Sequence, residues 1–299
     1  MNSKNTILDY SYSILSLVTM SLSVVLIHHA ADSLPPSLTL LASTLIAILF
    51  FHLVNVGKIF LLYKKAWETK KMWLMIMITI ALVWLATIYG PAYVSPALYI
   101  LLYFASSCVL GIIFDYKTTN NPYLIIAGIG ISLCSVGLTY EYIYSNSSLD
   151  TWLGVGLGLL GGITSFIYLK LSHVFSTSNQ LSATQVLALR FWLVLVCCIL
   201  LLPHHSMQYL HFNSLLIIVG VAFFSLILPV FFTMKSILKV GVEKSVIVSG
   251  LVPATTYLLQ SASSHFFDMK ALVLYLMTGF FIALPYGIRL IKSQQSRDR

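Results

Sequence analysis

The chain has 299 residues, of which 59% are hydrophobic and 9% are charged, and its mean hydropathy is +0.92. A soluble domain carries about 25% charged residues, so this composition excludes a soluble globular class and predicts a membrane protein with several spans. The net charge of +8 requires no nucleic-acid partner, because Lys and Arg gather in the cytoplasmic loops of such proteins.

Charged residues divide the chain into apolar stretches, and a helix needs about 20 apolar residues to cross a bilayer. Taken in chain order, ten stretches meet this requirement: 10–31, 35–56, 72–91, 95–115, 121–141, 151–170, 183–202, 213–235, 244–264 and 271–289. Two of the turns, at 90–96 and 203–205, contain no charged residue, so nine or eleven spans would result if one of them were misplaced. We therefore expect an all-α membrane protein with ten transmembrane helices.

The Lys and Arg residues predict how the chain is oriented. With the N-terminus in the cytoplasm, Arg190 lies within a span and Lys270 in an outside segment, and the other fifteen of the 17 Lys and Arg residues lie in cytoplasmic segments. Short cytoplasmic loops carry such an excess of Lys and Arg. We therefore expect an integral protein of the cell (inner or plasma) membrane, embedded in lipid, with both termini cytoplasmic.

Ten spans can be divided into two halves of five within one membrane domain, residues 1–145 and 146–299. An odd number of spans per half forces the two repeats into opposite orientations, which is common in secondary transporters. No residue-level repeat between the halves is visible. The span count and the loop lengths therefore allow two inverted five-helix repeats without demonstrating them.

Glycines recur at intervals of four in the sixth predicted span, at Gly154, Gly158 and Gly162. This spacing lets two helix backbones approach closely. The second helix can belong to the same chain or to another copy, so the pattern is compatible with a monomer or a weak homodimer.

Arg190 is the one basic residue that falls inside a predicted span rather than at an end or in a loop. Burying a guanidinium in a bilayer is costly, so such residues usually face a bundle interior or a wet cavity. Three interpretations are open: an anchor for a substrate carboxylate or phosphate, a gating or bracing partner of a carboxylate or of helix-end carbonyls, and a packing residue that snorkels to the inner headgroups.

Three segments resemble the drug/metabolite transporter superfamily of the EamA type. Residues 182–191, which end in Arg190-Phe191, resemble the family's seventh span, residues 242–260 with Pro253 resemble its ninth, and residues 93–99 resemble the start of its fourth. The chain departs from the family pattern near Ser43, where no arginine occurs, at 104–106, which lacks a proline, and at 266–268, which replaces a Gly-Glu pair. The resemblance implies two inverted five-span units around a central cavity.

The resemblance also implies that spans one, three, four, six, eight and nine line this cavity. Aromatic and hydroxyl residues lie at their middle levels, and we predict that they bind the substrate; they are Trp84, Tyr99, Tyr103, Phe224, Ser225, Thr256, Tyr257 and Gln260. Pro229 and Pro253 each remove a helix hydrogen bond and are candidate hinges. Helix packing is the competing interpretation of each single residue.

These observations predict a secondary transporter, an exporter of small organic metabolites such as amino acids or related zwitterionic or amphipathic solutes. No acidic residue lies at the middle of a predicted span, which argues against a buried carboxylate that exchanges a proton for the substrate. A nucleotide-derivative or cofactor exchanger is the alternative. A lipid-modifying membrane enzyme would need the outside histidines to converge with Asp32, Glu141 and Asp150. No catalytic, cofactor or metal motif occurs, so none is expected.

Overall fold

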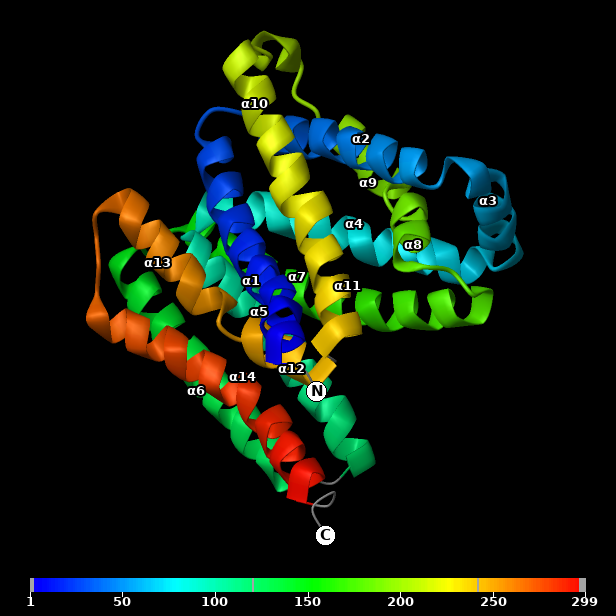
Figure 1. Cartoon of the computed structure of the whole chain (residues 1–299). Coiled ribbons are helices and arrows are strands. Elements are labelled where there is room, and N and C mark those ends of the chain that lie inside the picture. The colour runs from blue at the N-terminus through cyan, green and yellow to red at the C-terminus, as the bar shows by residue number, and fades with distance from the viewer. Residues whose placement is uncertain (1–2, 120, 241, 296–299) are drawn as a thin grey trace.

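The structure, a computed structural model, describes residues 3–119, 121–240 and 242–295, and every regular element in these ranges is helical (Figure 1). The α-helices are α1 (Ser3–Ala31), α2 (Pro36–Val54), α3 (Ile59–Glu68), α4 (Lys70–Tyr93), α5 (Pro96–Thr119), α6 (Pro122–Ser145), α7 (Leu149–Asn179), α8 (Ala183–Leu189), α9 (Trp192–Leu200), α10 (Phe212–Val221), α11 (Leu228–Val240), α12 (Val242–Ser249), α13 (Val252–Ser264) and α14 (Met269–Gln295). Three short elements join them: η1 (Val56–Lys58), η2 (Ser206–Tyr209) and the π-helical η3 (Ala222–Ile227).

Nine helical segments in these ranges are long and apolar enough to cross a membrane. They are Tyr10–Ala31, Pro36–Val54, Lys70–Tyr93, Pro96–Tyr116, Pro122–Ser145, Leu149–Asn179, Ala183–Leu200, Phe212–Thr233 and Met269–Arg289. Each coincides with a predicted span, so an all-helical, membrane-embedded chain is confirmed. The basic segment between the second and third spans is not an open loop, because α3 forms within it.

The remaining predicted span, 244–264, is divided into α12 and α13 by a break at Gly250 and Leu251. At this break the backbone of Gly250 packs against α14, and a Cβ on Gly250 would lie 3.1 Å from the carbonyl oxygen of Gly279. Pro253 stands in the first turn of α13. Its missing N–H has no intrahelical partner there in any case, so Pro253 begins a helix rather than bending one.

The seventh span also has a break, between α8 and α9 at Arg190 and Phe191. A capping box begins α8, since the Ser182 side chain accepts from the backbone of Gln185 and the Gln185 side chain accepts from that of Ser182. Where α8 ends, the indole Nε1 of Trp73 donates to the carbonyl oxygen of Leu189 at 2.9 Å. A side chain of another span therefore satisfies a carbonyl that borders the break, which contains neither glycine nor proline.

The eighth span changes its hydrogen-bond pattern immediately before Pro229. Residues 222–227 form the π-helix η3, and α11 begins one residue before the proline. A proline ring clashes with the carbonyl four residues earlier and supplies no N–H, which here is the carbonyl of Ser225. The wider π turn relieves this conflict while the helix continues, and π turns of this kind are frequent at functional sites.

The predicted close approach of helices at the glycines of α7 occurs within the chain. A Cβ on Gly162 would overlap the backbone carbonyl of Tyr103 and the hydroxyl of Ser106, both on α5. A Cβ on Gly158 would lie 2.9 Å from the Leu102 side chain, also on α5. The two glycines therefore pack α7 on α5 of the same chain, where they are not available to a second copy.

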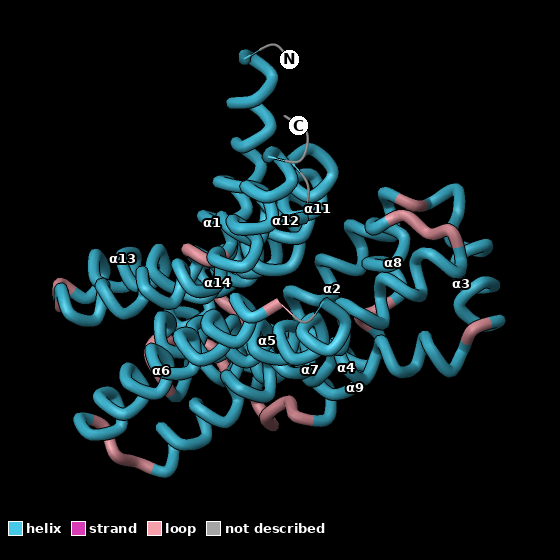
Figure 2. The backbone as a smooth tube through the Cα atoms, turned by 90° about the horizontal axis from the view of Figure 1, so that it is seen from below, coloured by secondary structure: helices cyan, strands magenta, loops and turns pink. Residues whose placement is uncertain are grey.

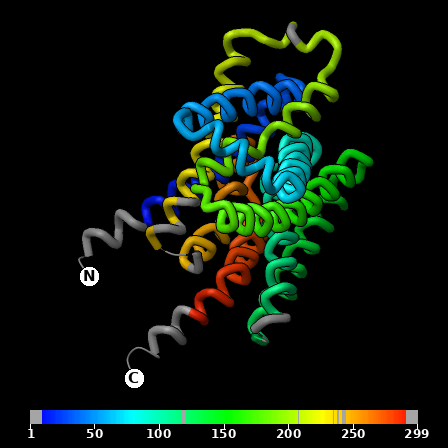
Figure 3. Tube along the Cα trace, turned by 90° about the vertical axis from the view of Figure 1, so that its right-hand side faces the viewer, coloured from blue at the N-terminus to red at the C-terminus, as the bar shows by residue number. Residues whose placement is uncertain are grey.

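The helices pack in an order that differs from their order in the chain. α7 lies against both α4 and α5, and α1 lies against both α11 and α13. Figure 2 shows α1, α11 and α12 gathered together, and Figure 3 shows α6 and α14 running side by side. Of the hydrophobic clusters that result, the two largest join mainly α2, α4, α7, α8 and α9 in one case, and α5, α13 and α14 in the other.

Candidate functional site

Arg190 lies inside the bundle, at the break between α8 and α9. Its side chain is buried, with 3% of its surface exposed, so it does not extend to the headgroups as a snorkelling arginine would. Nη1 donates to the hydroxyl oxygen of Tyr168 on α7 at 2.6 Å. The guanidinium carbon lies 4.4 Å from the ring centre of Phe191 and 5.4 Å from that of Tyr168. Aromatic rings therefore flank the buried charge.

Two of the three guanidinium nitrogens have no hydrogen-bond partner in the described part of the protein. Nε and Nη2 of Arg190 are buried and, among the described residues, find no acceptor. Burying an unpaired charged group is costly unless its hydrogen bonds are completed. The two unpaired nitrogens could therefore donate to an anion that is not part of the protein.

Tyr103 connects this group to the helices that were predicted to line a cavity. Its hydroxyl donates to Ser165 on α7 at 2.6 Å, and its side chain packs against the hydrophobic cluster that contains Tyr168. Trp84 belongs to the same hydrophobic cluster as Tyr168, and its buried Nε1 has no partner in the described part of the chain. The structure thus brings Trp84 and Tyr103 to the cluster that holds the neighbours of Arg190.

Other predicted binding residues make contacts within the protein instead. The Tyr99 side chain is fully buried and donates to Thr87 at 3.1 Å, and the hydroxyl of Thr256 donates to the carbonyl of Val252 at 2.8 Å. Gln260 accepts from the backbone N–H of Ala97 at 3.0 Å. Each of these polar contacts is made with another group of the protein.

Tyr257 holds the segment between α13 and α14. Its ring stacks on that of Tyr275 with the centres 5.0 Å apart. Its hydroxyl donates to the carbonyl oxygen of Asp268 at 3.0 Å and accepts from the N–H of Asp268 at 2.7 Å. A loop-fixing role accounts for both polar contacts of this side chain.

We expect Tyr257→Phe to lower the free energy of unfolding by about 1 kcal/mol, because two backbone groups of Asp268 lose their partner. Substrate affinity should stay unchanged. Thermal unfolding of the purified protein in detergent measures the first, and Tyr144→Phe is the control, since Tyr144 is 82% exposed. A change in substrate selectivity without a change in stability would instead place Tyr257 in the binding site.

The predicted residues of the eighth span lie around the π-helix. The Ser225 side chain is buried, and its hydroxyl finds no partner among the described residues. Phe224 is half-buried beside it. Pro229, which follows η3, therefore stands next to a polar group without a partner, at the one described place where this span departs from α-helical hydrogen bonding.

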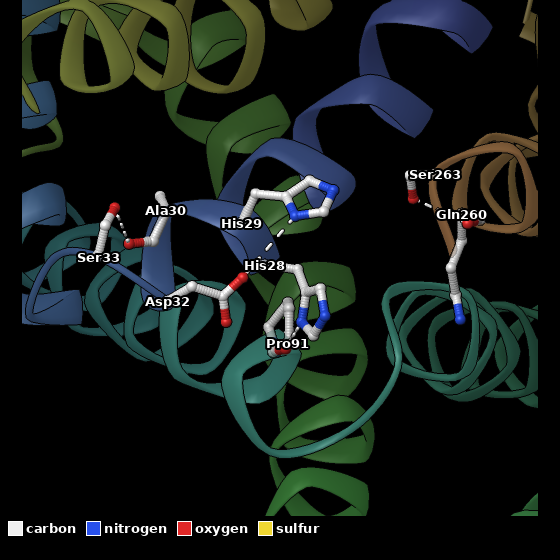
Figure 4. Close-up of polar contacts among 8 residues, drawn as sticks. All are labelled: His28, His29, Ala30, Asp32, Ser33, Pro91, Gln260 and Ser263. Carbon is white, nitrogen blue, oxygen red and sulfur yellow. Dashed lines mark hydrogen bonds and ion pairs between the residues drawn. The ribbon is translucent and has the colours of Figure 1, made fainter. Parts of the chain in front are cut away.

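Several helix ends on one side of the bundle are held by polar contacts (Figure 4). Nδ1 of His28, at the end of α1, lies 2.5 Å from the carbonyl oxygen of Pro91 in the last turn of α4. The neighbouring His29 lies 3.8 Å from Asp32. Because a carbonyl can only accept, His28 donates from Nδ1 and ties α1 to α4, while Gln260 ties α13 to the start of α5 on the same side.

His52 lies at the opposite end and is surrounded by aromatic residues. Its Nδ1 donates to the carbonyl of Ile48 at 2.8 Å, and its Nε2 contacts the hydroxyl of Tyr63 at 2.9 Å. The indole of Trp192 also donates to Tyr63, at 2.7 Å. Burial raises the pKa of Tyr63 above its ordinary value, against the effect of the Trp192 bond. The hydroxyl therefore stays protonated, accepts from Trp192 and lies within hydrogen-bond distance of His52.

A cleft of about 280 Å³ opens among α2, α8 and the junction of η3 with α11. It is lined by Phe50, Phe51, Val54, Ala183, Thr184, Leu187, Ile227, Leu228, Val230 and Phe231. None of the predicted binding residues lines it. Sequence reasoning missed this cleft because its lining comes from three distant segments and is almost entirely aliphatic or aromatic, with no motif to distinguish it from lipid-facing surface.

The histidines and acidic residues that an enzyme would need are dispersed. In the described ranges, no three His, Cys, Asp or Glu side chains come together in a group that could hold a metal ion. His29 and Asp32 form the one described ion pair, and it is exposed. His28 and His29 lie in the last turn of α1, Glu141 lies near the end of α6, and Asp150 lies in the first turn of α7.

Comparison with known proteins supports the fold and adds no function. No protein-family model matches the chain, and no curated protein matches it. The structure is similar to a solved one, described only as the crystal structure of a protein, with a TM-score of 0.63 and 13% sequence identity over 95% of this chain and 97% of that chain. At such low identity the similarity shows a shared fold alone.

Proposed function

We propose that the chain is a secondary transporter that moves small organic metabolites, such as amino acids and related solutes, out of the cell by alternating access. The observation that carries this proposal is the pattern of helix contacts. Two inverted repeats would exchange α1 with α7, α2 with α8–α9, α4 with α10–α11, α5 with α12–α13, and α6 with α14. A transporter built in this way has each helix contact matched by a contact of the exchanged pair.

Most of the principal contacts obey this exchange. The contact of α4 with α7 is matched by that of α11 with α1, and the contact of α5 with α7 by that of α13 with α1. The contact of α5 with α6 is matched by those of α12 and α13 with α14. Three contacts map onto themselves: α2 with α8 and α9, α5 with α13, and α6 with α14. The pattern supports inverted repeats although the two halves share no visible sequence repeat.

The exceptions to the exchange support alternating access. α4 contacts both α1 and α2, and α1 contacts α5. The exchanged pairs, which are α11 with α7, α11 with α8, and α7 with α13, have no comparable contacts among the described residues. The cleft of about 280 Å³ lies between α8 and α11, where one of these contacts is missing. A twofold axis in the membrane plane exchanges the outer and the inner ends of the helices. The contacts of α4 and α1 would therefore close the outer side, and the missing counterparts would leave the inner side open toward the cytoplasm.

Solute counterflow in proteoliposomes tests the proposal. Vesicles containing the purified protein are loaded with a mixed pool of amino acids, nucleotides and amphipathic amines, and mass spectrometry then reports which members exchange, with and without a pH gradient. We expect exchange of organic solutes of one class. No exchange by well-folded protein would contradict transport, and exchange of nucleotides alone would favour the nucleotide-derivative alternative.

We propose that both termini lie in the cytoplasm, and cysteine labelling can test this orientation. A membrane-impermeant maleimide should label Ser147→Cys in intact cells and Lys64→Cys only after the membrane is opened, because the segment between α6 and α7 would lie outside and α3 inside. Both positions are exposed. The parent protein, whose four cysteines lie within helices, is the control. Labelling of Lys64→Cys in intact cells would reverse the orientation.

A further inference from the structure

The guanidinium of Arg190 is a buried charge whose hydrogen bonds the protein does not complete. An arginine offers five N–H donors in a planar fork that fits a carboxylate through two parallel bonds. Here Nη1 is directed to Tyr168, while Nε and Nη2 have no acceptor in the described part of the chain. These two nitrogens form one edge of the fork, the edge through which an arginine holds a carboxylate side by side.

In the part of the chain that the structure describes, no acidic side chain forms an ion pair with this charge. Among the described residues, the contacts within 4.0 Å that qualify as ion pairs involve His29 and Asp32 and do not include Arg190. The guanidinium instead lies against the rings of Phe191 and Tyr168. Aromatic faces attract a cation weakly and do not accept at the free nitrogens. An anion from outside the protein would supply both the missing charge and the missing acceptors.

The cleft gives such an anion a direction of approach. Leu187 lines the cleft, and Arg190 follows it by three residues at the end of α8, which places both on one side of the helix. In the proposed inward-open state this cleft faces the cytoplasm. A solute that enters between α8 and α11 would therefore pass an apolar wall before it meets the guanidinium.

The residues around Arg190 favour a carboxylate over a phosphate. A phosphate carries up to two charges and is usually held by more than one cation or by a set of backbone N–H groups. The basic residue nearest in the chain to Tyr168, Lys170, is exposed and lies over the rings of Phe114 and Phe166, at 3.9 Å and 4.9 Å from their centres. The ammonium group of Lys170 therefore contacts these two rings. Among the described residues, Arg190 is the basic residue that is buried, and aromatic side chains surround it.

We propose that Arg190 binds the carboxylate of the transported solute through Nε and Nη2, and that the site selects organic monocarboxylates, including zwitterionic amino acids, with an apolar body. This inference rests on the proposed transport function. Tyr168 is a positioning residue, because its hydroxyl holds the other edge of the guanidinium. The apolar body of the solute would lie toward the lining of the cleft.

Binding to the purified full-length protein in detergent tests this inference separately from transport. Three carboxylates are compared with their own amides: phenylacetate with phenylacetamide, hexanoate with hexanamide, and L-phenylalanine with L-phenylalaninamide. Intrinsic tryptophan fluorescence and thermal shift report binding. We expect at least one carboxylate to bind about 30-fold more tightly than its amide, the ratio expected when a buried charge loses its ionic partner. Inorganic phosphate should not compete.

Two variants and one control identify the residue responsible. Arg190→Gln should remove the preference for the carboxylate over the amide, and Arg190→Lys should retain part of it, since a lysine keeps the charge but not the fork. Lys170→Gln, which removes a neighbouring exposed cation, should leave the preference intact. If the Arg190 variants fail to fold, the comparison of acids with amides on the unaltered protein still decides the question.

The outcomes separate the two proposals. Equal binding of every acid and its amide, or a carboxylate preference that survives in Arg190→Gln, would overturn the carboxylate site. Competition by phosphate at the same site would overturn the selection of monocarboxylates. Carboxylate binding in detergent without counterflow in vesicles would support the carboxylate site and contradict transport. Counterflow of neutral solutes alone would support transport and contradict the carboxylate site.

Discussion

Gly162→Ala is expected to lower sharply the yield of folded protein. The Cβ of an alanine would overlap the carbonyl oxygen of Tyr103 and the hydroxyl of Ser106, both on α5. The hydroxyl of Ser106 also donates to the carbonyl of Leu159 on α7 at 3.2 Å, so the two helices are joined at this level. A flexible side chain could turn aside, but a backbone carbonyl cannot move without its helix. Overpacking of this kind costs about 1–3 kcal/mol, and more when backbone must shift.

The same helix contains a matched control. Gly156 also belongs to α7, but a Cβ there would meet nothing within 4 Å. Gly156→Ala should therefore stabilise the protein by roughly 0.5–1 kcal/mol through the lower conformational entropy of alanine. Thermal unfolding in detergent and the monodisperse fraction on size-exclusion chromatography measure both variants. Equal stability of the two would mean that α5 and α7 are further apart than described.

Arg190→Ala is expected to reduce solute counterflow by at least about ten-fold while the folded yield changes by less than about two-fold. A buried ion that lacks an ionic partner contributes little net stability, and its removal can be neutral or favourable. The protein loses one hydrogen bond to Tyr168, which is worth about 1–3 kcal/mol when one partner is charged. A role in transport predicts that activity falls further than stability does.

Lys170→Ala is the control for this second prediction, because it removes a basic residue of α7 whose side chain is exposed. Counterflow by Lys170→Ala should stay close to that of the parent protein. Rates are normalised to the amount of monodisperse protein in the vesicles. If Arg190→Ala loses activity and folded yield in equal proportion, Arg190 has a structural role and braces the break between α8 and α9.

The spans could be predicted from the sequence because a membrane helix satisfies its own backbone. In hydrocarbon each N–H and C=O must be paired within the segment, so the length and apolarity of a stretch suffice to identify it. Nine predicted spans correspond to helical segments that are long and apolar enough to cross a membrane. The exception, 244–264, contains Gly250, and its break depends on the approach of α14, which no local property of the sequence reports.

The sequence indicates which residues of the candidate site are unusual, but it does not indicate which groups they contact. Arg190 stands out in the sequence because a charge within an apolar span is rare. Trp84 lies in the hydrophobic cluster that contains Tyr168 and Phe191, the neighbours of Arg190, and Tyr103 packs against that cluster. Tyr257 and Gln260 were predicted from the same kind of pattern, and in the structure they contact backbone groups of Asp268 and Ala97. Spacing along a helix predicts a shared face but not what that face contacts.

The sequence by itself determined the membrane class, the position of most spans and the singularity of Arg190, because hydrophobicity and charge are properties of each segment alone. The tertiary structure decided that α8 and α9 are separate helices, that Arg190 donates to Tyr168 and meets no carboxylate of the described residues, and where a cleft opens. These features depend on contacts between segments far apart in the chain. The free energies of these contacts depend on the packing of the whole bundle, which also excludes competing partners.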